Sequence, residues 1–412
     1  MSKKVLITLI LVIVVIPPVL IGGYFFFKNS DVSVGETISN VLPFGSGANL
    51  PLAPEDTENL PEEGSESIPD EFGAPKEKLF RLSQEPVAGA VILSGKASTT
   101  MVRYVDRATG HIYDVNLETL EKTKISNQTL PKVYEAYFRG DGKALLLRRL
   151  RDDSDVVENL SITLTAPNNF STSSIETGSL YSATSTLLRG DIGSVSTANN
   201  NLFYTLRDNS SVVSSAFSGA GAQTLLSSPF TDWNLVAYGN SVLLYTKASA
   251  SASGFAYTLG ASGLTKILGP LNALIALPNA SGNKILYSHV LGNEPRLFVK
   301  NLSTGVTAEI SVPTLAEKCV WSKNTSLVYC GSPSSDIGVN EPDNWYKGIS
   351  AFSDRVWSFD TESGFAKILV EPSLTLGLGV DVLEPKLSPN EDYLIFTNKA
   401  DLSLWALKLF EE

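Results

Sequence analysis

The sequence predicts an all-β fold, a seven-bladed β-propeller, in the C-terminal part of a 412-residue chain. A motif of two apolar strands joined by a tight polar turn recurs seven times from residue 90 onward. Most copies are spaced like propeller blades, each of which places four strands in about 40–45 residues. Charged residues make up only 18% of the chain. This fraction is below the soluble average of about 25% and is typical of turn-rich β structure.

The N-terminal segment, residues 1–28, predicts a transmembrane anchor. Val5 to Phe27 form an uncharged stretch of 23 residues, and about 20 apolar residues in a helix span a bilayer. Lys3 and Lys4 precede the stretch, so the positive-inside rule predicts a cytoplasmic N-terminus and an extracytoplasmic propeller, with residues 5–27 in the lipid bilayer. The alternative is a cleaved signal peptide, although the stretch lacks a good small-residue cleavage site.

Residues 29–75 predict a disordered, acidic, proline-rich tether. They contain six prolines and ten acidic residues but only two aromatic residues. This composition buries too little apolar surface to offset the entropy of ordering the chain. The whole chain carries −11, the anchor +3 and the tether −10, which leaves −4 for residues 76–412, the predicted propeller. A nearly neutral domain lacks the basic surface that phosphate binding requires, so nucleic acid is not an expected partner.

The recurring motif defines the blades. The centres of its second strands are Tyr104, Leu146, Tyr204, Leu244, Leu286, Val328 and Ile395. Four of the six separations between these centres are 40 or 42 residues, and the two longer ones predict insertions. Turns at Thr304-Gly305 and Ser363-Gly364 follow two of the pairs and supply the glycine that a positive φ at a hairpin favours. They predict a third and a fourth strand in each blade.

The last blade lacks a fourth strand of its own, because the sequence ends soon after the strand at Leu402 to Leu409. Lys78 to Ser83 match the pattern of the outermost strands in other blades. We therefore expect this N-terminal strand to pair beside Leu402–Leu409. Such pairing closes the ring and covers the sheet edge that would otherwise be free.

One copy of the motif resembles a known repeat. Ser388-Pro389-Asn390, followed by the strand Tyr393 to Thr397, is similar to the TolB-type, WD40-like (PD40-type) propeller repeat. The resemblance covers Lys76 to Phe410 and is one of strand and turn pattern. The copies at Leu93–Lys96 and Thr197–Asn201 lack the Ser-Pro-Asp/Asn core, and the Trp-Asp dipeptide of WD40 proteins is absent. The resemblance implies a propeller fold and no particular activity.

One insertion, Gly331 to Asp354 in the sixth blade, is the candidate recognition site. Loops on a rigid scaffold often carry function, and Trp and Tyr are enriched in binding hot spots. The candidate partner-binding residues are Asp343, Asn344, Trp345, Tyr346 and Lys347. The alternative is that Trp345 and Tyr346 fold back and plug the loop onto the propeller. The other insertion, between Thr165 and Gly190, predicts a flexible surface loop.

The two cysteines predict a disulfide. Cys319 and Cys330 belong to one hairpin, whose turn centres on Asn324 and Thr325. Opposed residues in a two-residue hairpin have a constant index sum, here 649, which the two cysteines share. Directly opposed Cβ atoms lie about 4.5–5.5 Å apart, close to the spacing of a disulfide, and export permits its oxidation. The alternative is a pair of buried free thiols.

No catalytic constellation is visible in the sequence. Only His111 and His289 are present, too few for histidine-based triads or zinc sites, and the common hydrolase and phosphate-loop motifs are absent. We therefore expect a non-enzymatic module of the cell envelope that binds a protein or glycan partner and needs no cofactor or metal. The alternative is a carbohydrate-active enzyme that uses paired carboxylates in the propeller channel.

Overall fold

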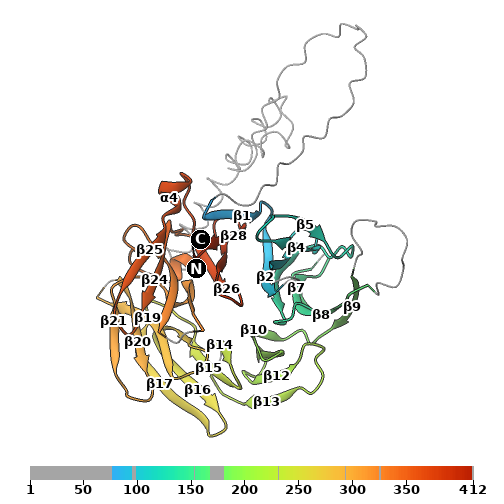
Figure 1. Ribbon diagram of the computed structural model, residues 1–412. Helices are drawn as coiled ribbons and strands as arrows, with labels where there is room; N and C mark the ends of the chain where they lie inside the picture. Colours follow the sequence, from blue (N-terminus) through green and yellow to red (C-terminus); the bar gives the residue numbers. More distant parts are fainter. Residues whose placement is uncertain are drawn as a thin grey trace, which may run out of the picture. The chain divides into compact units, whose positions relative to one another are not determined.

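Seven four-stranded antiparallel sheets follow one another along the chain and form a ring (Figure 1). The computed structural model describes residues 77–94, 99–152, 154–167, 181–230, 232–292, 294–323 and 326–410. The predicted anchor at residues 5–27 and the predicted tether at residues 29–75 lie outside this part of the chain. Within it, no helix combines the length and the apolar character that crossing a bilayer requires.

The first four blades each consist of four consecutive strands. Blade 1 contains β2 (Val87–Ser94), β3 (Thr100–Asp106), β4 (Ile112–Asn116) and β5 (Lys122–Lys124). Blade 2 contains β6 (Val133–Phe138), β7 (Ala144–Leu150), β8 (Val157–Thr165) and β9 (Ser182–Leu187). Blade 3 contains β10 (Ile192–Ala198), β11 (Asn201–Leu206), β12 (Val212–Ala216) and β13 (Gln223–Leu226). Blade 4 contains β14 (Trp233–Tyr238), β15 (Ser241–Thr246), β16 (Ser253–Gly260) and β17 (Gly263–Asn272).

The last three blades include the short helices and the one strand taken from the N-terminal side. Blade 5 contains β18 (Ile275–Pro278), β19 (Lys284–Leu291), β20 (Glu294–Asn301) and β21 (Thr307–Ile310). Blade 6 contains β22 (Cys319–Trp321), β23 (Leu327–Pro333), β24 (Asp354–Asp360) and β25 (Ala366–Val370). Blade 7 contains β26 (Val382–Leu387), β27 (Tyr393–Asn398), β28 (Leu404–Lys408) and β1 (Leu79–Ser83). The short helices are the 3₁₀ helix η2 (Ala316–Lys318), α3 (Asp343–Tyr346) and α4 (Pro372–Thr375).

The seven-bladed propeller predicted from the repeat is confirmed. The seven motif centres lie on β3, β7, β11, β15, β19, β23 and β27, the second strands of the blades. All seven side chains are at most 4% exposed. The repeat was detectable because each second strand is buried on both faces between neighbouring blades, so it is apolar at nearly every position. The first strands of neighbouring blades contact one another and therefore line the centre of the ring.

The sheet of blade 7 joins the two ends of the described chain. In the structure, β1 lies beside β28, with Leu79 opposite Leu407 and Phe80 opposite Ala406. Leu79 is 2% exposed, whereas the side chain of Arg81 between the buried positions is 36% exposed. The other four residues of β1 are buried, so both faces of the strand pack against buried side chains. The strand β1 thus covers the backbone groups of β28 that an open sheet would leave unpaired.

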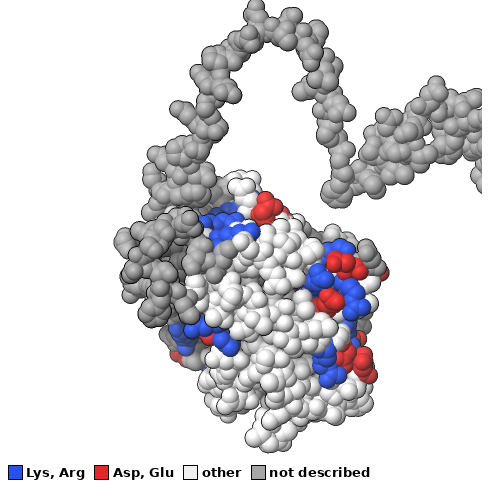
Figure 2. All heavy atoms as spheres, turned by 90° about the vertical axis from the view of Figure 1, so that its right-hand side faces the viewer, with Lys and Arg blue, Asp and Glu red and all other residues white. Residues whose placement is uncertain are grey.

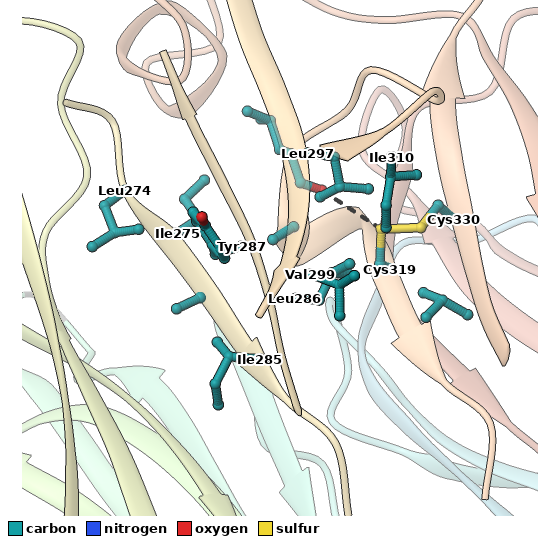
Figure 3. Close-up of a cluster of buried hydrophobic side chains, with 14 of the residues drawn as sticks. Leu274, Ile275, Ile285, Leu286, Tyr287, Leu297, Val299, Ile310, Cys319 and Cys330 are labelled. Carbon is teal, nitrogen blue, oxygen red and sulfur yellow. Dashed lines mark hydrogen bonds between the residues drawn. A yellow bond between two sulfur atoms is a disulfide. The ribbon is translucent and has the colours of Figure 1, made fainter. Parts of the chain in front are cut away.

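The predicted hairpin register and disulfide of blade 6 are both confirmed. Cys319 pairs with Cys330 across β22 and β23, the two sulfur atoms are bonded, and the Cα atoms are 4.1 Å apart. The disulfide lies beside buried side chains of blade 5, among them Leu297 and Ile310 (Figure 3). The disulfide therefore fixes a hairpin whose apolar face packs against the preceding blade.

Charged side chains are sparse on the side of the molecule drawn in Figure 2. Lys and Arg lie beside Asp and Glu in small mixed groups on a largely uncharged surface. On this side, the described residues present no continuous basic face of the kind that binds a phosphate backbone.

Candidate functional site

A cavity of about 590 Å³ lies where the innermost strands β6, β10 and β14 begin. Blade 6 contributes to it from the other side of the ring, through η2 and α3. Its charged lining residues are Glu135, Arg148, Arg207, Asp232, Lys247 and Glu317. The volume falls within the range of about 300–1,000 Å³ that is usual for small-molecule sites. The cavity is therefore large enough for a short saccharide and is rich in groups that transfer protons or bind charge.

Glu317 is the most perturbed carboxyl group of this cavity. It is the middle residue of η2, between the fully buried Ala316 and Lys318, so its backbone is held in place while its side chain lines the channel. The hydroxyl of Tyr346 donates a hydrogen bond of 2.6 Å to Glu317 Oε1. Burial raises the pKa of Glu317 to about 7, although this hydrogen bond and the charges of Lys318 and Lys399 act in the opposite direction.

Glu135 is a second carboxylate of the cavity, and its environment is different. It lies on β6 opposite Arg148 of β7, whose Nη1 donates a hydrogen bond of 2.7 Å to Glu135 Oε2. The hydroxyl of Tyr137 donates to the same oxygen at 3.1 Å. Arg148 is also fixed through its hydrogen bond of 3.2 Å to the carbonyl oxygen of Ile192. The ion pair thus orients Glu135 on the inner surface of the ring.

Glu317 borders a second cavity at the other end of the same inner strands. This cavity has a volume of about 540 Å³, and Tyr137, Val195 and Glu317 line both cavities. Glu384 and Lys386 of β26 line the second one. The three shared residues therefore mark the narrow part of a channel that reaches Glu317 from both faces of the propeller.

Two cations of the first cavity are available for an anionic ligand. Arg207 and Lys247 are both exposed, and the charge of Arg207 contributes to the lowered pKa of Asp191. Arg207 Nη2 donates to the carbonyl oxygen of Gly190 at 2.7 Å. Exposed positive charge at a cavity mouth raises the local concentration of anions.

The sixth-blade insertion lies between β23 and β24 and is shorter than predicted. Gly331 to Pro333 extend β23, and Pro333 pairs with Asp354, so the insertion comprises residues 334–353. Asp343 reaches blade 4, where its Oδ2 accepts a hydrogen bond of 2.6 Å from the backbone N–H of Ala250. The insertion thus extends from its own blade to a loop of blade 4.

Trp345, one of the candidate partner-binding residues, is buried. Its side chain is 1% exposed, its Nε1 donates to Asp381 Oδ2 at 2.8 Å, and its ring packs against Phe352 with centroids 6.3 Å apart. Trp345 plugs the insertion onto the propeller, as the alternative held. Tyr346 is 37% exposed and contacts Glu317 instead. No contact in the structure tests a role in partner binding for Asp343, Asn344, Tyr346 or Lys347, so that role stays a prediction.

The sequence motifs did not identify Glu317 or Glu135. The only signal near them was their position, since each lies close to the start of an inner strand, β22 or β6. Acidic residues at the start of the first strand of several blades meet in the channel. This relation between strand position and the channel can be used only after every strand has been assigned to a blade.

Comparison with solved structures finds this fold in oligogalacturonate lyases. The lyase in complex with manganese matches with a TM-score of 0.52 and 10% identity, over 81% of this chain and 93% of that chain. The lyase from Vibrio parahaemolyticus matches with a TM-score of 0.54 and 11% identity, over 82% and 96%. TolB from Acinetobacter baumannii matches with a TM-score of 0.40 and 14% identity, over 67% and 62%. No family model and no curated protein matches the sequence.

One of these lyases holds manganese, which raises the question of a metal site in this chain. The described residues contain no group of three or more His, Cys, Asp or Glu side chains placed to hold a metal ion. His111 and His289 lie apart, one in blade 1 and the other on β19 of blade 5. The described residues of this propeller therefore do not fit a metal centre built from such side chains.

The prediction of a non-enzymatic binding and scaffolding module is overturned by the structural comparison. Likeness at 10–11% identity shows the fold alone. Both lyases are nevertheless enzymes that share this fold over nearly their whole length, so the lack of a familiar catalytic motif is no ground for a non-enzymatic function. Among the expectations drawn from the sequence, the carbohydrate-active alternative is the one that these structures favour.

Proposed function

We propose that this chain is a carbohydrate-active enzyme that transfers protons with carboxyl groups in the propeller channel. The observation that carries the proposal is Glu317, a carboxyl group with a pKa of about 7 in the wall of a cavity of about 590 Å³. An acid with a pKa near the working pH is the most effective proton donor and acceptor. Raising a carboxyl pKa by burial is how many glycosidases obtain their general acid.

Glu135 supplies the second carboxyl group that such chemistry requires. Cleavage of a glycosidic bond uses one carboxylic acid to protonate the leaving oxygen and one carboxylate to act on the other side of the reacting carbon. Glu317 suits the first role because burial favours its protonated form. Glu135 suits the second role because Arg148 and Tyr137 hold it by hydrogen bonds. Two carboxyl groups with such different environments are a common acid–base arrangement.

Arg207 and Lys247 favour an acidic saccharide as the substrate. Both cations line the cavity, and both are exposed. A uronate or another anionic sugar would place a negative charge beside these two cations. The two structures of the same fold are named for action on oligogalacturonate, which belongs to this class.

The test is to incubate the full-length protein with neutral and uronate oligosaccharides and to measure new reducing ends and the ultraviolet absorbance of unsaturated products. Reducing ends without absorbance indicate hydrolysis, and absorbance indicates elimination. We expect Glu317→Gln to lower the rate by about 100-fold or more. The matched control is Glu309→Gln, because Glu309 lies on β21 and its side chain is 46% exposed. Full activity of Glu317→Gln, or no product from any saccharide, would contradict the proposal.

A further inference from the structure

A cluster of one lysine and two aspartates is sealed between blades 6 and 7. Lys318 ends η2, Asp354 begins β24 and Asp381 precedes β26, and all three side chains are 0% exposed. Lys318 Nζ lies 2.8 Å from Asp354 Oδ2 and also contacts Asp381 Oδ1. One positive and two negative groups without solvent are costly to bury. The cluster does not line the proposed active-site cavity, so its role is a separate question.

The two oxygens of Asp381 have different surroundings. Oδ2 accepts hydrogen bonds from the indole Nε1 of Trp345 at 2.8 Å and from the backbone N–H of Phe352 at 3.0 Å. Oδ1 faces the amine of Lys318. Two fixed donors on one oxygen of a carbonyl group stabilise the negative charge that develops there when a nucleophile attacks the carbon. The carboxyl carbon of Asp381 is therefore positioned as an electrophile, and the amine of Lys318 lies beside its other oxygen.

Asp354 is placed to move protons within this cluster. Its Oδ2 contacts Lys318 Nζ and accepts a hydrogen bond of 2.7 Å from the backbone N–H of Val382. Its Oδ1 is buried and has no hydrogen-bond partner among the described residues. Buried polar atoms without a partner are rare and call for an explanation. Burial raises the pKa of Asp354 to about 6, so this carboxyl group takes up a proton more readily than an exposed aspartate.

Aromatic rings enclose the reacting atoms. Lys318 Nζ lies 5.0 Å from the ring centroids of both Trp345 and Phe352. These rings belong to the insertion, so its folding completes the enclosure. Exclusion of water strengthens the local electrostatic interactions and prevents hydrolysis of the product.

We propose that Lys318 and Asp381 condense into an intramolecular amide bond. Lys318 gives a proton to Asp354, and its Nζ lone pair then attacks Cγ of Asp381. Asp354 passes this proton to Oδ1, then takes a second proton from Nζ and delivers it to Oδ1 as well. The bond between Cγ and Oδ1 breaks, and Oδ1 leaves as water. An ammonium and a carboxylate thus give one amide and one water, with no oxidant or reductant. The reaction removes two of the three buried charges and joins blade 6 to blade 7 covalently.

The test is the intact mass of the purified full-length protein after reduction of its disulfide. We expect a mass one water below that of the sequence, and a proteolytic fragment that joins the peptides containing Lys318 and Asp381. The internal control is Lys284 and Glu362, which form an ion pair of 3.0 Å with Glu362 70% exposed and should remain unlinked. A mass equal to that of the sequence, or a water loss that maps to other residues, would overturn the proposal.

Two variants test the chemistry. Asp381→Asn should yield the same linked product with loss of ammonia in place of water, because the leaving group changes while the amide is identical. Asp354→Ala should keep its full mass, because no group remains to move the proton from Lys318. An intact Cys319–Cys330 disulfide shows that each variant has folded. Complete linkage in folded Asp354→Ala would refute the role of Asp354. Because neither readout measures carbohydrate turnover, both results are independent of the proposed enzymatic function.

Discussion

Single residues acquire unusual chemistry in this propeller where the backbone is buried and the side chain reaches the channel. Glu317 is such a residue: its neighbours in η2 are buried, and among the described residues Tyr346 makes the one direct hydrogen bond to its carboxyl group. Burial disfavours the charged form of a carboxyl group. The proton on Glu317 is thus linked both to proposed catalysis and to stability.

Glu317→Gln should make the stability of the protein less sensitive to pH. The folded pKa of Glu317 is raised from 4.5 to about 7, so its stabilising contribution is complete below about 4.5 and is lost as the pH rises through about 7. We compare the free energy of unfolding of the variant with that of the wild type. With solvent screening allowed for, this difference should be more favourable to the variant at pH 8 than at pH 4, by on the order of 2 kcal/mol. Urea unfolding of both proteins at the two pH values measures this. An equal difference at both values would contradict the raised pKa.

Tyr346→Phe should raise the pKa of Glu317 further. The tyrosine hydroxyl donates to the carboxyl group and lowers its pKa relative to the effect of burial alone. Without the donor the charged form loses a hydrogen bond, so the carboxyl group should titrate above about 7. Carbon-detected NMR titration of the glutamate carboxyl groups measures the shift. Tyr113→Phe in blade 1, outside the cavity, is the control, and a lower pKa in Tyr346→Phe would refute the contact.

At the scale of elements, the sixth-blade insertion is fixed to the propeller mainly by its buried side chains. Trp345 is buried, whereas Ile349 of the same insertion is 71% exposed. Asp343 accepts a hydrogen bond from Ala250 of blade 4, and Tyr346 donates one to Glu317 of the cavity. The insertion therefore serves as a fixed wall of the cavity.

Trp345→Ala should destabilise the protein by about 3–5 kcal/mol, because truncating a buried Trp leaves a cavity. It also removes the indole hydrogen bond to Asp381, which is 0% exposed. The midpoint of urea unfolding measures the loss. Ile349→Ala is the matched control and should change stability by about 0.5 kcal/mol or less. Equal stability of the two variants would contradict the burial of Trp345 in the insertion.

At the scale of the whole molecule, ring closure depends on a strand far from the rest of its sheet in sequence. Blade 7 takes β1 from one end of the described chain and β26 to β28 from the other. Each remaining blade is a local unit of four consecutive strands. The ring therefore has one junction at which the ends of the propeller meet.

Leu79→Ala on β1 should cost about 2–5 kcal/mol, because the side chain is 2% exposed and packs in the core of blade 7. Arg81→Ala on the same strand should cost about 1 kcal/mol or less, because its ion pair with Asp401 is exposed and 3.5 Å long. Thermal unfolding of the two variants compares them. Equal melting temperatures would show that β1 does not stabilise the ring.

The sequence by itself determined the blades, the propeller and the disulfide, because each depends on residues close together in the chain. A tight turn fixes which residues face each other across a hairpin, so the index sum placed Cys319 opposite Cys330 without any tertiary information. The apolar second strands likewise reflect burial between neighbouring blades that repeats at a constant interval. Anchor, tether and cellular location rest on residues outside the described part and stay predictions.

Only the tertiary structure decided which side chains meet in the channel and which are buried. Glu135 and Glu317 line one cavity although four blade junctions separate them in the chain, and no local spacing predicts that meeting. An aromatic side chain in a loop has the same sequence signal whether it binds a partner or plugs a core. Trp345 is buried, and its indole N–H donates a hydrogen bond to Asp381, which is 36 residues away in the chain. Burial of this kind depends on contacts between blades, and a single sequence does not specify them.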